Sequence, residues 1–411
     1  MAVRVVAAPW VLLGAPPAGV PAVPPEGAAL RDGAVALQGG RVLAVGPRAE
    51  VEARHGPAEP WDAVLLPALA NAHLHLELSH LAGRVPGGEG LAPWILRLVA
   101  ERARAPAEPG DAAMARGVEA LEAAGVAAVG EVSNTLASLA ALGWAGFAGT
   151  VYHEVFGFSD ERAEAALRAA SEARATATTG PTSLGVALSP HALYSTNPRL
   201  LQRLLRQGPA SIHLAEDPAE RLFAARGEGP LCAIARQLGA GDADLGSRSR
   251  SAVAAVAPFL GPRSLAVHGV DLDDQDLADL RRSGATVVLC PRSNLHIGGR
   301  LPDLPRLLDA GIPLAVGTDS LASSPSLSPL EELAALRRAY RQIPAARLLP
   351  LAWNGAAVGA PALGRLAEGT APGLLAAPLD GERPADPFAW LLDTAGRRLA
   401  WVARHRLEVR P

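Results

Sequence analysis

The chain has 411 residues, of which 49% are hydrophobic and 19% are charged, and its 38 basic and 41 acidic side chains give a net charge of −3. This composition excludes an intrinsically disordered chain, because such chains combine low hydrophobicity with high net charge. No block of basic residues is present, so nucleic acid and anionic membranes have no electrostatic reason to bind. The length suits two or three domains, or fewer if one of them is an α/β barrel.

Every basic residue is an arginine, which excludes chemistry that requires lysine, such as a Schiff base or a carbamylated-lysine metal bridge. The two cysteines, Cys232 and Cys290, lie too far apart in the chain for a close-spaced metal knuckle. A single disulfide between them would be too little to indicate a secreted scaffold. We therefore expect a cytoplasmic protein.

Residues 1–23 resemble a signal peptide in having one arginine, an apolar stretch and small residues. Prolines interrupt the apolar stretch at Pro9 and at Pro16 and Pro17, and Val3–Ala7 reads equally well as a strand that opens a domain. We favour the strand. No apolar run approaches the roughly 20 residues that a membrane-spanning helix needs.

Short strands separated by Gly and Pro turns fill the first part of the chain, at Val3–Ala7, Ala34–Leu37 and Arg41–Val45. Further on, apolar strands alternate with helices, which predicts parallel strands joined by right-handed crossovers. The predicted strands are Val64–His73, Val126–Val132, Gly146–Val155, Ser183–Leu188, Ala210–Ala215, Ser264–Gly269, Thr286–Cys290 and Ile312–Thr318.

The predicted helices are Asp160–Thr178, Pro198–Gln207, Ser249–Leu260, Asp273–Ser283, Pro329–Ile343 and Arg347–Gly359. Repetition of strand and helix in this way predicts an α/β protein with a (β/α)8 TIM barrel over residues 61–360. Residues 1–60 consist of short strands and turns, and the same pattern comes back in residues 361–411. We expect them to form one small β-sandwich domain built from both chain ends.

Titratable side chains follow several of the predicted strands. The two-residue period of a strand places His73 and His75 on one face, and three other strands end at His213, His268 and Asp319. Chemistry in such barrels is located at the carboxyl ends of the strands. Buried histidines and carboxylates are costly unless paired or bound to metal, so these ends predict a metal site. The alternative is a set of ordinary histidines satisfied by backbone groups.

Six segments together resemble the amidohydrolase superfamily, in its cytosine-deaminase-like and chlorohydrolase-like branch: PALANAHLHLELS, SPHALYS, HLAEDPAE, VHG, CPRSN and GTDSLAS. The resemblance implies a single divalent metal held by His73, His75, His213 and Asp319. It also implies three catalytic residues: Glu216 as a proton shuttle, His268 beside the reacting water, and Asp319 as the acceptor of the water's proton. The binuclear members use a lysine that this chain lacks.

Three imidazoles and one carboxylate suit zinc best, with iron or manganese as alternatives. A metal site of this kind lowers the pKa of water to near 7. Glu216, three residues after a ligand, can then protonate a ring nitrogen and the departing ammonia. His75 and Glu77 also match the H-x-E pattern of another zinc-deaminase fold, but that fold needs a P-C-x-x-C segment, which is absent from the sequence.

Seven residues are predicted substrate contacts from their positions: Glu77, Trp94, Glu154, His191, Arg292, Ser293 and Asn294. Arg292 is the expected partner of a substrate carboxylate, because a guanidinium can bind one bidentately. Glu77 could instead be a helix N-terminal charge, Trp94 a packing aromatic, and Ser293 and Asn294 loop caps.

Within the branch, the HLHLELS, HEVFG and CPRSN segments are most similar to 6-aminodeoxyfutalosine deaminases of menaquinone biosynthesis. The expected reaction is hydrolysis of an adenine-type nucleoside, 6-aminodeoxyfutalosine, to futalosine and ammonia. Guanine, S-adenosylhomocysteine, adenosine or a chlorotriazine are alternative substrates, and a non-catalytic barrel is a further alternative. The partner is therefore a small nucleoside, and both a monomer and a homodimer remain open.

Overall fold

The computed structural model describes residues 2–15, 29–104, 110–177, 183–241 and 245–404. The strand expected at Val3–Ala7 is present and longer, as β1 (Val3–Leu12), and it pairs antiparallel with β2 (Ala29–Gln38). Residues 1 and 16–23 of the segment weighed as a signal peptide lie outside the described residues. No helix in the described ranges is long and apolar enough to cross a membrane.

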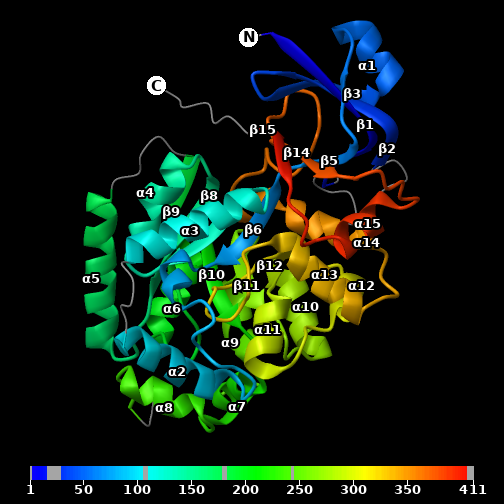
Figure 1. Ribbon diagram of the computed structural model, residues 1–411. Coiled ribbons are helices and arrows are strands. Elements are labelled where there is room, and N and C mark those ends of the chain that lie inside the picture. Colours follow the sequence, from blue (N-terminus) through cyan, green and yellow to red (C-terminus); the bar gives the residue numbers. More distant parts are fainter. Residues whose placement is uncertain (1, 16–28, 105–109, 178–182, 242–244, 405–411) are drawn as a thin grey trace.

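Strands from both chain ends form one seven-stranded sheet in the order β15-β14-β5-β1-β2-β3, with β4 also paired to β1. Figure 1 shows these blue and red segments together, above the barrel. Buried valines and leucines of the sheet form a hydrophobic cluster, among them Val6, Val11, Val35 and Leu65. The other members are β3 (Arg41–Pro47), β4 (Glu59–Pro60), β5 (Ala63–Pro67), β14 (Leu374–Pro378) and β15 (Ala400–Ala403), and α1 (Arg48–His55) and α15 (Pro387–Asp393) accompany them.

Eight parallel strands form the barrel as two four-stranded sheets, β6-β7-β8-β9 and β10-β11-β12-β13. Bridges from Leu74 to Asp319 and from Ala192 to His213 join the two sheets. The predicted TIM barrel with a small β domain is therefore confirmed. The strands are β6 (Leu69–Leu74), β7 (Val126–Ser133), β8 (Ala148–Val155), β9 (Ser183–Pro190), β10 (Ala210–Leu214), β11 (Ser264–His268), β12 (Thr286–Leu289) and β13 (Leu314–Val316).

Helices surround the barrel between successive strands (Figure 1). They are η1 (Leu76–Leu81), α2 (Leu91–Arg104), α3 (Gly110–Ala123), α4 (Ala137–Trp144), α5 (Asp160–Thr176), α6 (Pro198–Gln207), α7 (Pro218–Arg226), α8 (Leu231–Gln237), α9 (Ala252–Val256), η3 (Ala257–Phe259), α10 (Asp274–Ser283), α11 (Pro291–Gly298), α12 (Leu304–Asp309), α13 (Pro329–Ala339), α14 (Ala345–Leu348), η4 (Leu349–Trp353) and η5 (Gly355–Val358).

The first predicted barrel strand, Val64–His73, is wrong as a single element. It consists of β5 in the small sheet and β6 in the barrel. Pro67 ends β5, and proline interrupts a ladder because it has no N–H to donate. The small sheet therefore extends past residue 60.

Four helix predictions were too long. The segment Ser249–Leu260 holds only α9 and η3, Pro329–Ile343 ends at Ala339, and Arg347–Gly359 is divided among α14, η4 and η5. Pro258 and Pro350 stand in the first turns of η3 and η4, where proline permits a new start but not a continuing α-helix. Asp160–Thr178 ends at Thr176 as α5, and Thr178 lies outside the described residues.

The barrel closes where β13 meets β6, and a glycine is required there. A Cβ on Gly317 would lie 2.7 Å from the backbone oxygen of His73 and 2.8 Å from its Cβ, so a larger residue would push the strands apart. The amides of Thr318 and Asp319 both donate to the His73 carbonyl at 3.0 Å. This closure places the start of the GTDS segment beside His73.

Candidate active site

Three histidines from two strands meet at one end of the barrel. His73 lies in β6, His75 directly follows it, and His213 lies in β10; their ligand nitrogens are all within 4.8 Å of one another. Burial, followed by the neighbouring histidines, lowers the pKa of His73 well below its usual value, and burial lowers the pKa of His213 to about 3. Both imidazoles are therefore neutral at pH 7 and carry a lone pair for a metal.

The orientation of these rings fits a divalent ion. The Nε2 atoms of His73 and His75 face each other at 3.2 Å. Two nitrogens about 2.1 Å from one tetrahedral ion would lie about 3.4 Å apart. His213 donates from Nδ1 to the His191 carbonyl at 3.2 Å, which leaves the lone pair on Nε2. A cation shared by these rings satisfies lone pairs that would otherwise point at one another.

Asp319 stands next to this triad as the fourth group expected from the sequence. Its Oδ1 lies 3.6 Å from His75 Nε2, while Ser293 donates to Oδ2 at 2.6 Å and Ser323 donates to Oδ2 at 3.1 Å. Burial acts to raise the pKa of Asp319, but His75, His268 and the Ser293 hydroxyl lower it, and the net direction is downward. Asp319 is therefore an ionised carboxylate beside the triad.

Glu216 and His268 form a second pair beside the triad, with 3.6 Å between Glu216 Oε2 and His268 Nε2. Burial, together with Asp319 and Glu220, raises the pKa of Glu216 well above its usual value. Burial lowers the pKa of His268 to about 4. Asn294 donates from Nδ2 to His268 Nδ1 at 3.0 Å, which places the ring proton on Nε2. A protonated carboxyl and a neutral imidazole N–H thus face the same space.

The strand ends that carry these groups have unusual backbones. Ala215, His268 and Asp319 have φ angles of 54°, 82° and 56°, in the left-handed region that non-glycine residues rarely adopt. Each such residue costs on the order of 1–3 kcal/mol and persists only where its surroundings hold it. Such outliers cluster at functional sites, and here they adjoin Glu216 and the metal-binding groups.

Two of the predicted substrate contacts lie directly beside the triad. The ring of His191 is centred 4.7 Å from that of His213, and Glu154 Oε1 lies 3.7 Å from His213 Nδ1. Glu154 accepts a hydrogen bond from Asn134 Nδ2 at 3.0 Å through Oε2, while its buried Oε1 has no hydrogen-bond partner among the described residues. That oxygen is free to accept a hydrogen bond from a ligand.

Ser293 and Asn294 are in the site, but their polar groups are used by the protein. The Ser293 hydroxyl binds Asp319, and the Asn294 amide binds His268. Their position after a barrel strand correctly predicts that they lie near the other site residues. Their contacts, however, orient Asp319 and His268.

The interpretation of Arg292 as a carboxylate anchor is wrong. Its Nε donates to Glu332 at 2.7 Å, and its Nη1 binds Glu331. Its Nη2 donates to the hydroxyl groups of Ser324 and Ser326, in the loop before α13. Arg292 lies in the first turn of α11, and these contacts direct its side chain toward α13. The guanidinium is therefore committed to holding two helices together.

Glu77 and Trp94 also have structural partners. Both oxygens of Glu77 accept hydrogen bonds from residues 133–135 after β7, including the Asn134 amide at 3.0 Å. Trp94 is buried in the main hydrophobic core. For both residues, the alternative structural interpretation fits the contacts better.

Three supporting residues were not predicted. Ser323 donates to Asp319, Asn134 donates to Glu154, and Glu220 accepts from the backbone amides of Ala215 and Glu216 at 3.1 and 2.7 Å. Sequence signals exist for two of them, because Ser323 and Glu220 each lie four residues after a site carboxylate. Asn134 simply follows a strand end, a position that many loop residues share.

The arrangement of a (β/α)8 barrel with imidazoles and carboxylates at its strand ends defines a metal-dependent hydrolase. A family model described as "Amidohydrolase family" matches residues 64–388, and one described as "Imidazolonepropionase-like composite domain, bacteria" matches residues 33–58. The chain belongs to the amidohydrolase family. It is an amidohydrolase deaminase that hydrolyses carbon–nitrogen bonds.

Curated relatives agree with the family assignment. The chain is 30% identical over 374 residues to a 5-methylthioadenosine/S-adenosylhomocysteine deaminase of Nitratidesulfovibrio vulgaris, covering 83% of this chain and 78% of that one. It is 29% identical over 337 residues to an aminodeoxyfutalosine deaminase of Deinococcus radiodurans, with 76% and 78% covered.

Two crystal structures share the fold. The aminofutalosine deaminase of Helicobacter pylori, in complex with methylthio-coformycin, superimposes with a TM-score of 0.80 at 22% identity, covering 96% of this chain and 97% of that one. The atrazine chlorohydrolase TrzN of Arthrobacter aurescens, complexed with zinc, gives a TM-score of 0.75 at 18% identity, covering 99% and 96%.

Proposed function

We propose that this enzyme removes the amino group from an adenine-type nucleoside by hydrolysis, using one divalent ion, best zinc. The observation that carries the proposal is the meeting of the His73, His75 and His213 triad with two carboxylates of opposite protonation state, Asp319 and Glu216. An ionised base and a protonated acid beside one metal site are the parts that hydrolytic deamination needs.

A divalent ion held by the three histidines and Asp319 supplies positive charge that lowers the pKa of nearby water toward neutrality. Asp319 accepts a proton from the water as its oxygen bonds to the carbon that bears the amino group. Glu216 donates its proton to the adjacent ring nitrogen. The His268 Nε2–H donates a hydrogen bond that orients the incoming oxygen. The hydroxyl group on that carbon then returns a proton to Glu216 as it becomes a carbonyl, the carbon–nitrogen bond breaks, and ammonia leaves with the proton that Asp319 received.

Our preferred substrate is 6-aminodeoxyfutalosine. The HLHLELS, HEVFG and CPRSN segments support it, and so does the similarity to the aminodeoxyfutalosine deaminase of Deinococcus radiodurans. Glu154 and His191, which flank the triad, are the proposed contacts for the sugar or the group attached to it.

A second substrate class is 5-methylthioadenosine or S-adenosylhomocysteine. The 30% identity to the deaminase from Nitratidesulfovibrio vulgaris favours it. The commitment of Arg292 to Glu331 and Glu332 also removes the residue that was expected to select a benzoate-like carboxylate.

The test is ammonia release from purified protein whose metal content has been measured. The substrates are 6-aminodeoxyfutalosine, 5-methylthioadenosine, S-adenosylhomocysteine, adenosine, guanine and cytosine, with chloride release from a chlorotriazine followed separately. Glu216→Gln prepared in parallel is the control for contaminating activity. We expect the highest kcat/KM with 6-aminodeoxyfutalosine. A preference for 5-methylthioadenosine would transfer the assignment to the second class, and metal-loaded protein that deaminates no nucleoside would overturn the proposal.

A further inference from the structure

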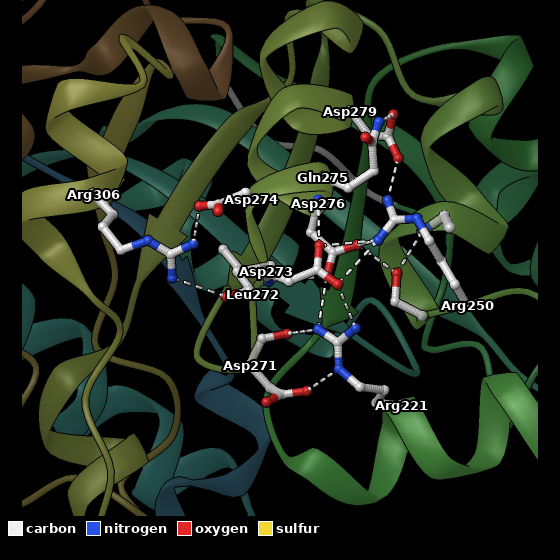
Figure 2. A network of polar contacts seen from close by, with 12 residues as sticks. Arg221, Arg250, Asp271, Leu272, Asp273, Asp274, Gln275, Asp276, Asp279 and Arg306 are labelled. Atoms are coloured by element: carbon white, nitrogen blue, oxygen red, sulfur yellow. Dashed lines mark hydrogen bonds and ion pairs between the residues drawn. The ribbon is translucent and has the colours of Figure 1, made fainter.

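Two arginines and a row of aspartates form a charged network at the start of α10 (Figure 2). Arg221 of α7 donates from Nε to Asp271 Oδ2 at 2.7 Å, from Nη2 to the Asp271 carbonyl at 3.0 Å, and from Nη2 to Asp276 Oδ2 at 2.7 Å. Arg250 binds Asp273, Asp276 and Asp279 from the other side. Asp276 is fully buried between the two guanidinium groups.

Asp271 connects this network to the site, because it lies in the short loop between His268, the last residue of β11, and α10. The amides of Val270 and Asp271 donate to the carbonyl of Ala215 at 2.7 and 2.9 Å, and Gly269 donates to the carbonyl of Leu214 at 3.1 Å. The loop of His268 is therefore laid against the segment that leads into Glu216. Both Ala215 and His268 have left-handed backbones, which need outside support.

Helix α7 supplies that support through two consecutive residues. Glu220 accepts the amides of Ala215 and Glu216, while Arg221 holds Asp271 by its side chain and its carbonyl. One turn of one helix thus fixes the loops that carry both members of the Glu216–His268 pair. Arg250 also binds Asp273 and Asp276, the two aspartates at the start of α10 that Arg221 contacts. Among the described residues, however, Arg250 makes no hydrogen bond to residues 268–271.

We propose that Arg221 is a positioning residue that fixes the distance between Glu216 and His268 through its hydrogen bonds to Asp271. The inference rests on the proposed function, in which these two groups transfer a proton and orient the attacking oxygen. Arg250 stabilises the start of α10 and does not set this distance. The two arginines therefore offer a matched pair within one network.

The kinetic test compares Arg221→Met with Arg250→Met, using the nucleoside that the wild-type protein deaminates best. Displacing a catalytic group by about 1 Å can cost about 100-fold in rate. We expect Arg221→Met to lower kcat by about 10- to 100-fold, with KM within about threefold and metal content unchanged. Arg250→Met should keep kcat within about threefold while lowering Tm. Arg221→Lys, which restores a charge without the fork, should recover part of the kcat. Asp271→Asn, which leaves α7 intact, should lower kcat in the same direction if Arg221→Met fails to fold.

A second measurement is independent of the substrate. The ring resonances of His268 are followed by NMR in zinc-loaded protein with labelled histidine, and are assigned by their loss in His268→Gln. Arg221→Met and Asp271→Asn should shift them, whereas Arg250→Met should not. Equal kcat losses in the two methionine variants, or unmoved His268 resonances in folded Arg221→Met, would overturn the proposal. If the wild-type protein deaminates no nucleoside, the proposed function fails, and the NMR comparison still decides whether Arg221 positions His268.

Discussion

The two four-stranded halves of the barrel contribute to the site in different ways. The half formed by β6–β9 supplies His73 and His75 from the end of β6, where neither residue has a left-handed backbone and the two Nε2 atoms face each other. The half formed by β10–β13 supplies His213 from β10, and Glu216, His268 and Asp319 from strand ends that include three left-handed residues. Binding a metal requires lone pairs that converge, whereas transferring protons requires groups at fixed separations, and the groups proposed to transfer protons lie beside a strained backbone.

The largest effect is expected at His73, in the half of the barrel formed by β6–β9. His73→Ala removes one of three imidazoles whose nitrogens lie within 4.8 Å of one another, so the variant should bind much less than one metal per chain and lose activity. Metal analysis after dialysis, with the surface variant His55→Ala as the control, measures this. One equivalent of metal retained by His73→Ala would show that the ligand assignment is wrong.

A variant at Glu216, in the half formed by β10–β13, should show the opposite result: it should keep its metal and lose turnover. Glu216→Gln keeps the size of the side chain but removes its acidic proton, and general acid–base catalysis contributes about 100- to 10,000-fold. We expect kcat to fall by about 1,000-fold with metal content unchanged. Wild-type kcat should also fall as the pH rises through the raised pKa of Glu216, because the protonated acid is the active form. Activity retained by Glu216→Gln would remove the residue from proton transfer.

The same contrast explains how much could be predicted from the sequence. The barrel and the convergence of His73, His75, His213 and Asp319 could be predicted from the residues, because strand periodicity and the carboxyl-end rule act locally. Glu216 could be predicted only from the family resemblance. The direction of the Arg292 side chain could not, since it depends on Glu331 and Glu332, which lie about forty residues away in the chain. The break between β5 and β6 likewise depends on β14, which pairs with β5 from the far end of the chain.

A smaller effect, on substrate binding, is expected to distinguish two carboxylates in the half formed by β6–β9, Glu154 and Glu77. Glu154 has a buried oxygen beside His213 that has no hydrogen-bond partner in the described part of the chain, whereas both oxygens of Glu77 are satisfied by residues 133–135. Glu154→Gln should raise KM about tenfold with little change in kcat, about the size expected for the loss of one hydrogen bond. Glu77→Gln should leave KM within about twofold and lower Tm instead. Equal changes in KM for both variants would remove Glu154 from substrate contact.

The smallest effect on catalysis should come from Arg292, although its effect on stability should be large. Its side chain is 11% exposed and pairs with the fully buried Glu332, so Arg292→Met leaves that carboxylate without its cation. Removing one partner of a buried pair costs about 3–5 kcal/mol of unfolding free energy. Urea unfolding should show this loss, while KM for each nucleoside of the panel stays within about threefold of the wild type. The double variant Arg292→Met with Glu332→Gln removes the uncompensated charge and should recover part of the stability. A rise in KM confined to substrates that carry a carboxylate would contradict the structural role and restore Arg292 as their anchor.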